Sequence, residues 1–158
     1  MTRAVPRYSS RTLPRTAFVP GVSQRADRPT EPLSRPAVVD FNALSGDEDF
    51  RHGVDLFNHG FPWEAHEAWE PLWFTAPRDR PERELLQGLI HAAAAAVKAK
   101  AGALDAARGF VDSACGHFAL ASSSILDLAE LAAALTAWGD DPSQPPPTLI
   151  LIAAPAAS

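Results

Sequence analysis

Apolar residues recur at helical spacing through the middle of the 158-residue chain. The first such series has spacings of four and three residues, the period of a helix face, at Phe50, Val54 and Phe57. Ser45 and Glu48, just before it, form the pattern of a capping box and predict where this helix begins. Gly60 predicts where it ends, because glycine readily adopts the left-handed turn after a helix.

A second amphipathic segment follows directly. Its apolar residues fall on one helical stripe, at Phe61, Ala65, Ala68, Trp69, Leu72 and Trp73. Pro62 suits the first turn of a helix. Pro71 has no amide proton, so we expect this helix to kink or to end near that position.

Three further helices are predicted, over about residues 81–100, 103–120 and 124–138. Gly102 closes the helix over 81–100. The alanine run of this helix, at 92–96, lacks bulk, so a neighbouring helix can approach closely there. No segment shows the alternation of a strand followed by a hairpin turn. The fold class predicted is therefore all-α, a small bundle of about five helices.

Proline marks the ends of the chain. Eleven of the fifteen prolines lie in residues 1–36 and 142–155, where they prevent regular helix. We therefore expect an extended Pro/Arg-rich N-terminal arm over residues 1–37 and a helical bundle domain over 38–139. A Pro-rich, apolar tail over 140–158 is expected to pack on the bundle as an extended segment.

Charge separates the arm from the rest. Residues 1–36 carry seven arginines and two acids, whereas the remainder carries seven basic and seventeen acidic residues. An acidic body does not suit phosphate contacts, so no nucleic-acid partner is expected. The basic arm is expected to lie over the acidic body or to be loose, and it could also contact an acidic partner.

The expected location is cytoplasmic. Cys115 is the single cysteine, which excludes an internal disulfide and fits a reducing compartment. No apolar run is long enough to cross a membrane, so no membrane partner is expected. The arm lacks the apolar core of a secretory signal, and Pro6 and Pro14 oppose the amphipathic helix of a transit peptide. Homo-oligomerisation stays open.

The candidate chemistry lies on the second and third predicted helices. His66 and Glu70 are four residues apart, so they share one helix face, and Glu67 flanks them. Gln87 and His91 lie beside the leucine stripe of the next helix. If these helices pack antiparallel, the two polar faces meet and form a candidate site of His66, Glu67, Glu70, Gln87 and His91.

Three interpretations of this cluster are open. A divalent metal, the one candidate cofactor, could bind at His66 and Glu70, since imidazole and carboxylate suit Zn, Fe, Mn or Ni. The pair could instead act as an acid/base without metal, or form a buried polar network that fixes helix register. The sequence lacks both the Glu-x-x-His spacing of bundle metal sites and the H-E-x-x-H pattern. Trp63, Trp69 and Trp73 would be core residues or the water-excluding wall of a pocket.

Three stretches in order, "FNHGFPWEAHEAWEPLW", "LLQGLIHAAAA" and "GALDAAR", resemble the family called domain of unknown function 309, over about residues 45–136. The "AFVPG" stretch is similar to the Pro-Gly arm that precedes the domain in bacterial members. The resemblance implies a small all-helical bundle in which the His-Glu helix and the Gln-Gly helix form one feature. It implies no activity. The alanine-rich third helix and the longer tail depart from the family pattern.

Two functional hypotheses follow. In the first, the protein has a His/Glu polar site between the second and third helices that binds a divalent metal or a small molecule, and whether it is an enzyme is undecided. In the alternative, it is a non-enzymatic interaction or adaptor protein whose His-Glu network is structural. Its function would then lie in a groove or in the basic arm.

Overall fold

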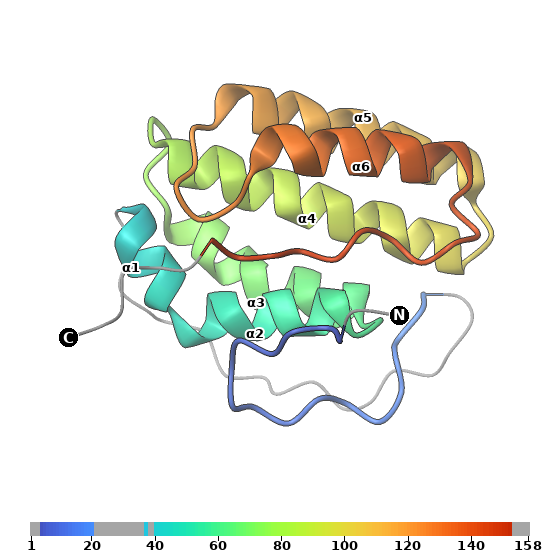
Figure 1. Cartoon of the computed structure of the whole chain (residues 1–158), viewed down its shortest axis with the longest axis horizontal. Coiled ribbons are helices and arrows are strands. Elements are labelled where there is room, and N and C mark those ends of the chain that lie inside the picture. Colours follow the sequence, from blue (N-terminus) through green and yellow to red (C-terminus); the bar gives the residue numbers. More distant parts are fainter. Residues whose placement is uncertain (1–3, 21–36, 38–39, 153–158) are drawn as a thin grey trace.

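A computed structural model describes residues 4–20, 37 and 40–152. The regular structure of this part of the chain is entirely helical, which confirms the predicted all-α class. Six helices are described, one more than expected (Figure 1). They are α1 (Phe41–Gly46), α2 (Glu48–Asn58), α3 (Pro62–Thr75), α4 (Pro81–Lys100), α5 (Leu104–Leu120) and α6 (Leu128–Asp140).

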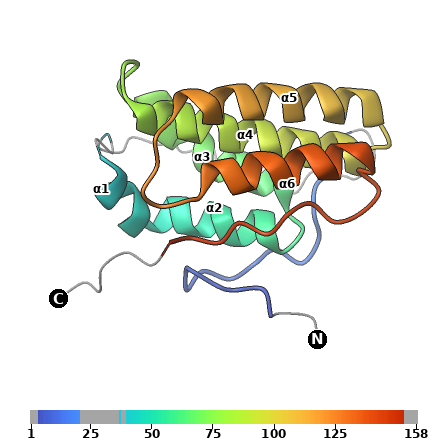
Figure 2. The same ribbon diagram turned by 45° about the horizontal axis from the view of Figure 1, so that its top comes forward.

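The five long helices pack in chain order, each against the next. α4 lies in the middle, with α3 and α2 on one side and α5 and α6 on the other (Figures 1 and 2). Short connections make consecutive helices antiparallel, the usual result of such loops in bundles. One continuous apolar core joins them, and its largest fully buried side chains include Trp69, Phe50 and Leu44.

Two glycines set the closest helix contacts. A Cβ at Gly53 would lie 2.2 Å from the indole nitrogen of Trp69, and a Cβ at Gly88 would lie 2.5 Å from the ring of Phe118. The first contact brings α3 onto α2, where the Trp69 indole donates a hydrogen bond of 3.2 Å to the carbonyl of Phe50. The second brings α5 onto α4. These glycines are therefore required by packing.

The start of α2 differs from the prediction. Ser45 lies inside α1 and is buried, so it cannot cap the following helix. Asp47 is the cap instead, and its carboxylate accepts from the amide of Phe50 at 2.9 Å. The helix α1 was missed because six residues are too few to show apolar periodicity. At the other end, Gly60 has a φ of 92°, the left-handed turn predicted there.

The helix α3 contains Pro71 and ends four residues after it, at Thr75, whose hydroxyl donates to the Pro71 carbonyl at 3.0 Å. One other boundary moved. The last helix begins at Leu128 and not near 124, because Asp127 caps it by accepting from the amide of Glu130. Ile125 is buried as expected, but from a loop.

Both ends of the described chain lie against α2 (Figures 1 and 2). In the tail, the side-chain amide of Asn58 donates to the carbonyl of Leu149 at 2.8 Å and accepts from its amide at 2.7 Å. Leu149 is buried, as expected for an extended segment packed on the bundle. The hydroxyl of Tyr8 in the arm accepts from the amide of Leu151 at 3.1 Å, so arm and tail also contact each other. No helix in the described part of the chain has the length and apolar character needed to span a membrane.

Candidate functional site

The imidazole of His66 and the carboxylate of Glu70 meet on the surface of α3. The Nε2 atom of His66 lies 3.1 Å from a carboxylate oxygen of Glu70, as the spacing of four predicts. The His66 side chain is 25% exposed and that of Glu70 is 51% exposed, so water screens this pair. Glu67 lies on the same helix and is partly buried.

Gln87 and His91 lie on α4, and both are partly buried. Within the described residues, no hydrogen bond joins either of them to His66 or Glu70. The ring of His91 instead meets two rings from α5, Phe110 at 5.8 Å and His117 at 5.0 Å between centroids. Thus the described contacts link His91 to α5.

His117 contacts both His91 and Glu84, so it connects these two residues of α4. Its Nδ1 atom lies 2.7 Å from a carboxylate oxygen of Glu84, which is one turn before Gln87 on α4. Burial, and then the neighbouring His117, lower the pKa of His91 below the ordinary value of 6.5. His117 lies on α5 and Glu84 on α4, so no pattern along one helix relates the two residues.

The three tryptophans of α3 have different surroundings. Trp69 is fully buried in the core, while Trp73 lies under the guanidinium of Arg83, 4.5 Å from its ring. Trp63 lies between the ring of Phe18 in the arm, at 5.1 Å, and the ring of His66, at 5.3 Å. Of the three, Trp63 is the one in ring contact with the candidate pair.

Three polar atoms near this contact are buried and have no hydrogen-bond partner among the described residues. They are Nε1 of Trp63, one carboxylate oxygen of Glu64, and Nδ1 of His66. The other oxygen of Glu64 accepts from the amide of Phe18 at 2.7 Å. A buried polar group without a partner is costly, so this turn of α3 could accept a polar ligand or water.

The strongest polar contacts with the arm lie one helix away, at Asp55 on α2. Its carboxylate is fully buried and accepts from the amides of Tyr8 at 2.7 Å and Ser9 at 2.9 Å. It also accepts from the Ser9 hydroxyl at 2.9 Å and from Nε of Arg7 at 3.1 Å. The guanidinium of Arg51, also on α2, donates a hydrogen bond to the carbonyl of Tyr8.

The electrostatics of Asp55 depend on the arm. Burial by itself would raise the pKa of its carboxyl group, because a charge is poorly solvated there. The hydrogen bonds from Tyr8, Ser9 and Arg7 outweigh burial and hold the pKa below its ordinary value of 3.8. The arm therefore keeps this carboxylate charged.

A second ion pair and a ring contact continue the attachment. Arg11 lies 2.6 Å from the carboxylate of Asp49, and Phe18 reaches Trp63 and Glu64 on α3. The expected contact of a basic arm with an acidic body is therefore present over residues 4–20. Asp55 and Glu64 were absent from the predicted site, because an acid on a helix does not reveal which distant backbone it will meet.

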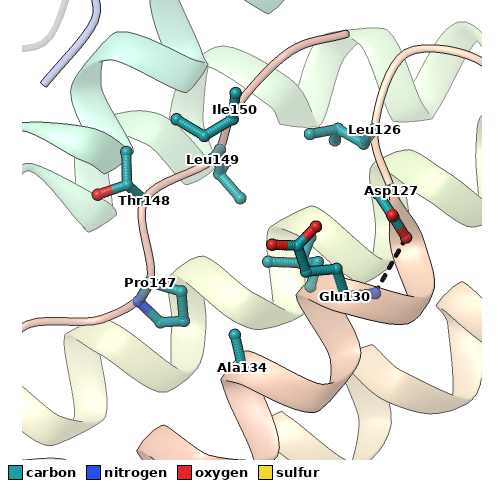
Figure 3. Close-up of a pocket in the computed structure, with 9 residues that line it drawn as sticks. Leu126, Asp127, Glu130, Ala134, Pro147, Thr148, Leu149 and Ile150 are labelled. Atoms are coloured by element: carbon teal, nitrogen blue, oxygen red, sulfur yellow. Dashed lines mark hydrogen bonds between the residues drawn. The ribbon is translucent and has the colours of Figure 1, made fainter. Parts of the chain in front are cut away.

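Two cavities lie against the tail. The smaller, of about 90 Å³, lies between the first turns of α6 and the tail at Pro147–Ile150, and Glu130 extends into it (Figure 3). It has room for only a few waters, at about 30 Å³ each. The larger, of about 330 Å³, lies where α2, α4 and the tail meet.

The described residues contain no group of three or more His, Cys, Asp or Glu side chains arranged to hold a metal ion. His66 and Glu70 would together supply two ligands. A bound metal would need further ligands from water or from a molecule other than this part of the chain.

Comparison with known protein families finds a match. The sequence model of the family described as Domain of unknown function (DUF309) matches residues 50–110. Over these residues the chain is similar to that family. The match runs from α2 into α5, so it contains the His66–Glu70 pair, Asp55 and His91, and it is shorter than the resemblance over 45–136. A search of the curated proteins finds no match.

Proposed function

We propose that the protein is a non-enzymatic interaction domain whose α2–α3 face binds an extended basic peptide segment. In this structure, residues 4–20 of its own arm occupy the face. One observation carries the proposal: the buried carboxylate of Asp55 takes all four of its described hydrogen bonds from the arm.

The chemistry of the contact is that of peptide recognition. Two of the bonds to Asp55 come from consecutive backbone amides, Tyr8 and Ser9, and a third backbone amide, that of Phe18, bonds to Glu64. Backbone contacts hold an extended chain whatever its side chains are. Arg7 and Arg11 add selectivity for positive charge, because each meets a carboxylate of α2.

The same contacts would exist if the arm were permanently attached. The experiment therefore measures whether an added peptide can replace the arm on this face. The probe is a fluorescently labelled peptide of residues 4–20, added to the full chain. We expect weak binding to the wild-type protein, whose face is already occupied. Arg7→Ala in the protein weakens its own arm, and we expect it to raise peptide affinity about fivefold, the size of one ion pair whose arginine is partly exposed.

The matched control is Arg15→Ala. Arg15 is an exposed arginine of the same segment for which no contact is described, so this variant should bind the peptide as the wild type does. A peptide carrying R7E should not bind the Arg7→Ala protein. Equal peptide affinity for the two variants, or unchanged binding of the R7E peptide, would contradict the proposal.

A second candidate is the small-molecule or divalent-metal site at His66 and Glu70, with Glu67, Gln87 and His91 nearby. It is supported by the unpartnered atoms of Trp63, Glu64 and His66. A ligand there would meet an indole N–H donor, a carboxylate acceptor and an imidazole nitrogen, so it would both donate and accept hydrogen bonds.

The metal content of untagged protein, and its melting temperature with and without chelator, test the metal form of this candidate. Stoichiometric metal that disappears in His66→Ala would support it. A metal-free protein whose stability falls in His66→Ala would support a structural network, which fits the interaction domain. The cytoplasmic location and the oligomeric state remain predictions under both functions.

A further inference from the structure

The cavity of about 330 Å³ lies at the end of the bundle where α2 and α4 end and the tail begins. Its size falls at the lower end of the range of about 300–1,000 Å³ usual for small-molecule sites. Its walls are mainly apolar and come from parts of the chain that are far apart in sequence. They include Phe57, Pro62, Ala96, Ala99 and Trp138, with Lys100 beside them.

The hollow has a cause in the sequence. Besides Lys100, α4 presents only the methyl groups of Ala96 and Ala99 to this space, which the rings of Phe57 and Trp138 also line. The tail covers the gap with a proline-rich stretch, residues 142–146, which cannot fold back as helix to fill it. The short side chains of α4 thus leave a space.

Hydrogen bonds between lining residues hold the walls of the cavity in place. The indole of Trp138 donates to the carbonyl of Gln144 at 2.8 Å, which holds the tail against α6. Lys100 donates to the carbonyl of Gly60 at 2.9 Å, which ties the end of α4 to the α2–α3 turn. The site is therefore formed before any ligand binds, which lowers the cost of binding.

Lys100 gives the cavity its one described charge. An ammonium group has three donors, and the bond to Gly60 uses one of them. The chain has only two lysines, Lys98 and Lys100, both exposed, and Lys98 does not line the cavity. An apolar space with a cation beside it is complementary to a molecule with an apolar body and an anionic head.

We propose that this cavity binds an amphipathic carboxylate of medium chain length, with its apolar body against Phe57 and Trp138 and its head group at Lys100. The site is separate from the arm-binding face and from His66. Its occupation does not depend on either function proposed for them.

The experiment titrates the full chain with decanoate, and with 1-decanol as the uncharged analogue, by isothermal titration calorimetry. We expect saturable one-to-one binding of decanoate. Lys100→Gln should weaken decanoate about fivefold, the value of an exposed ion pair, and should leave decanol unchanged. Lys98→Gln, the matched control on the same helix end, should change neither.

Ala99→Leu tests the apolar part, since the added carbons project from a partly exposed position into the space and should weaken both ligands. Three results would overturn the proposal: no decanoate binding by the wild type, equal effects of Lys100→Gln and Lys98→Gln, or unchanged binding in Ala99→Leu. Circular dichroism of each variant establishes that it is folded before titration.

Discussion

The carboxylate of Asp55 accepts a hydrogen bond of 2.7 Å from the main-chain amide of Tyr8, 47 residues earlier in the sequence. In Figure 1 the arm runs beside α2, on the side away from α5 and α6. The contact between Asp55 and Tyr8 makes a surface helix into the attachment point of the arm. A carboxylate that is fully buried by an extended segment has no comparable partner once that segment leaves.

Replacing Asp55 with alanine should therefore detach the arm. Removing a charged acceptor of several hydrogen bonds costs about 2–3 kcal/mol, partly offset because the freed amides reach water. Urea unfolding would measure the loss, and trypsin would cut faster after Arg7 and Arg11. Asp49→Ala, which removes an exposed partner of Arg11, should cost less than about 1 kcal/mol. Equal trypsin rates in the wild type and Asp55→Ala would exclude this role.

Acid should release the arm for the same reason. The pKa of Asp55 is lower in the folded protein than its ordinary value of 3.8. A lowered carboxyl pKa gives stability that is complete above the unfolded value and is lost as the pH falls through the folded one. Hydrogen exchange of the Tyr8 and Ser9 amides should thus stay protected at pH 3.8 and lose its protection only at lower pH. Loss already above that value would mean that another group controls the attachment.

The close contact between α2 and α3 makes Gly53 intolerant of a side chain. In Gly53→Ala the new methyl would meet the indole of Trp69, which must shift and lose its bond to Phe50. We expect a loss of about 2–4 kcal/mol in the free energy of unfolding. Gly109→Ala is the control, because a Cβ there meets nothing within 4 Å and alanine favours helix by about 0.5–1 kcal/mol. The two substitutions should differ in sign by thermal denaturation.

The pKa of His91 predicts a pH dependence near neutrality. Burial and His117 lower it below 6.5, so the unfolded chain binds the proton more readily than the folded one. Stability should be greatest above 6.5 and should fall as the pH drops through the folded pKa. His91→Gln should lose less stability than the wild type between about pH 7.5 and pH 5. His52 also has a lowered pKa, through burial and then Arg11, so His52→Gln must be measured beside it. If His91→Gln shows the full wild-type slope, the pH dependence arises elsewhere.

The long helices could be predicted from the sequence because their signals are local. Pro81 and Gly102 bracket α4 within the chain itself, and the period of its leucines is independent of any neighbour. The first residues of α2 and α6 were harder to predict from the sequence. Ser45 and Asp47 are both good caps, and only the formation of α1 removes the first of them from competition.

In the candidate site, too, contacts within one helix could be predicted and contacts between helices could not. The pairing of His66 with Glu70 follows from a spacing of four on one helix, and the structure has it at 3.1 Å. The contacts of His91 do not follow from its own helix, since His117 and Phe110 come from α5.

By itself, the sequence determined the five long helices, the resemblance to a known family and the opposite charges of arm and body, because periodicity and composition do not depend on how the helices pack. Only the tertiary structure decided that Asp55 meets Tyr8, that Glu84 meets His117, and that short side chains on α4 leave a cavity beside Lys100. Each of these depends on which surfaces come together when separate helices pack. That choice minimises the free energy of the whole chain, and no short stretch of residues contains it.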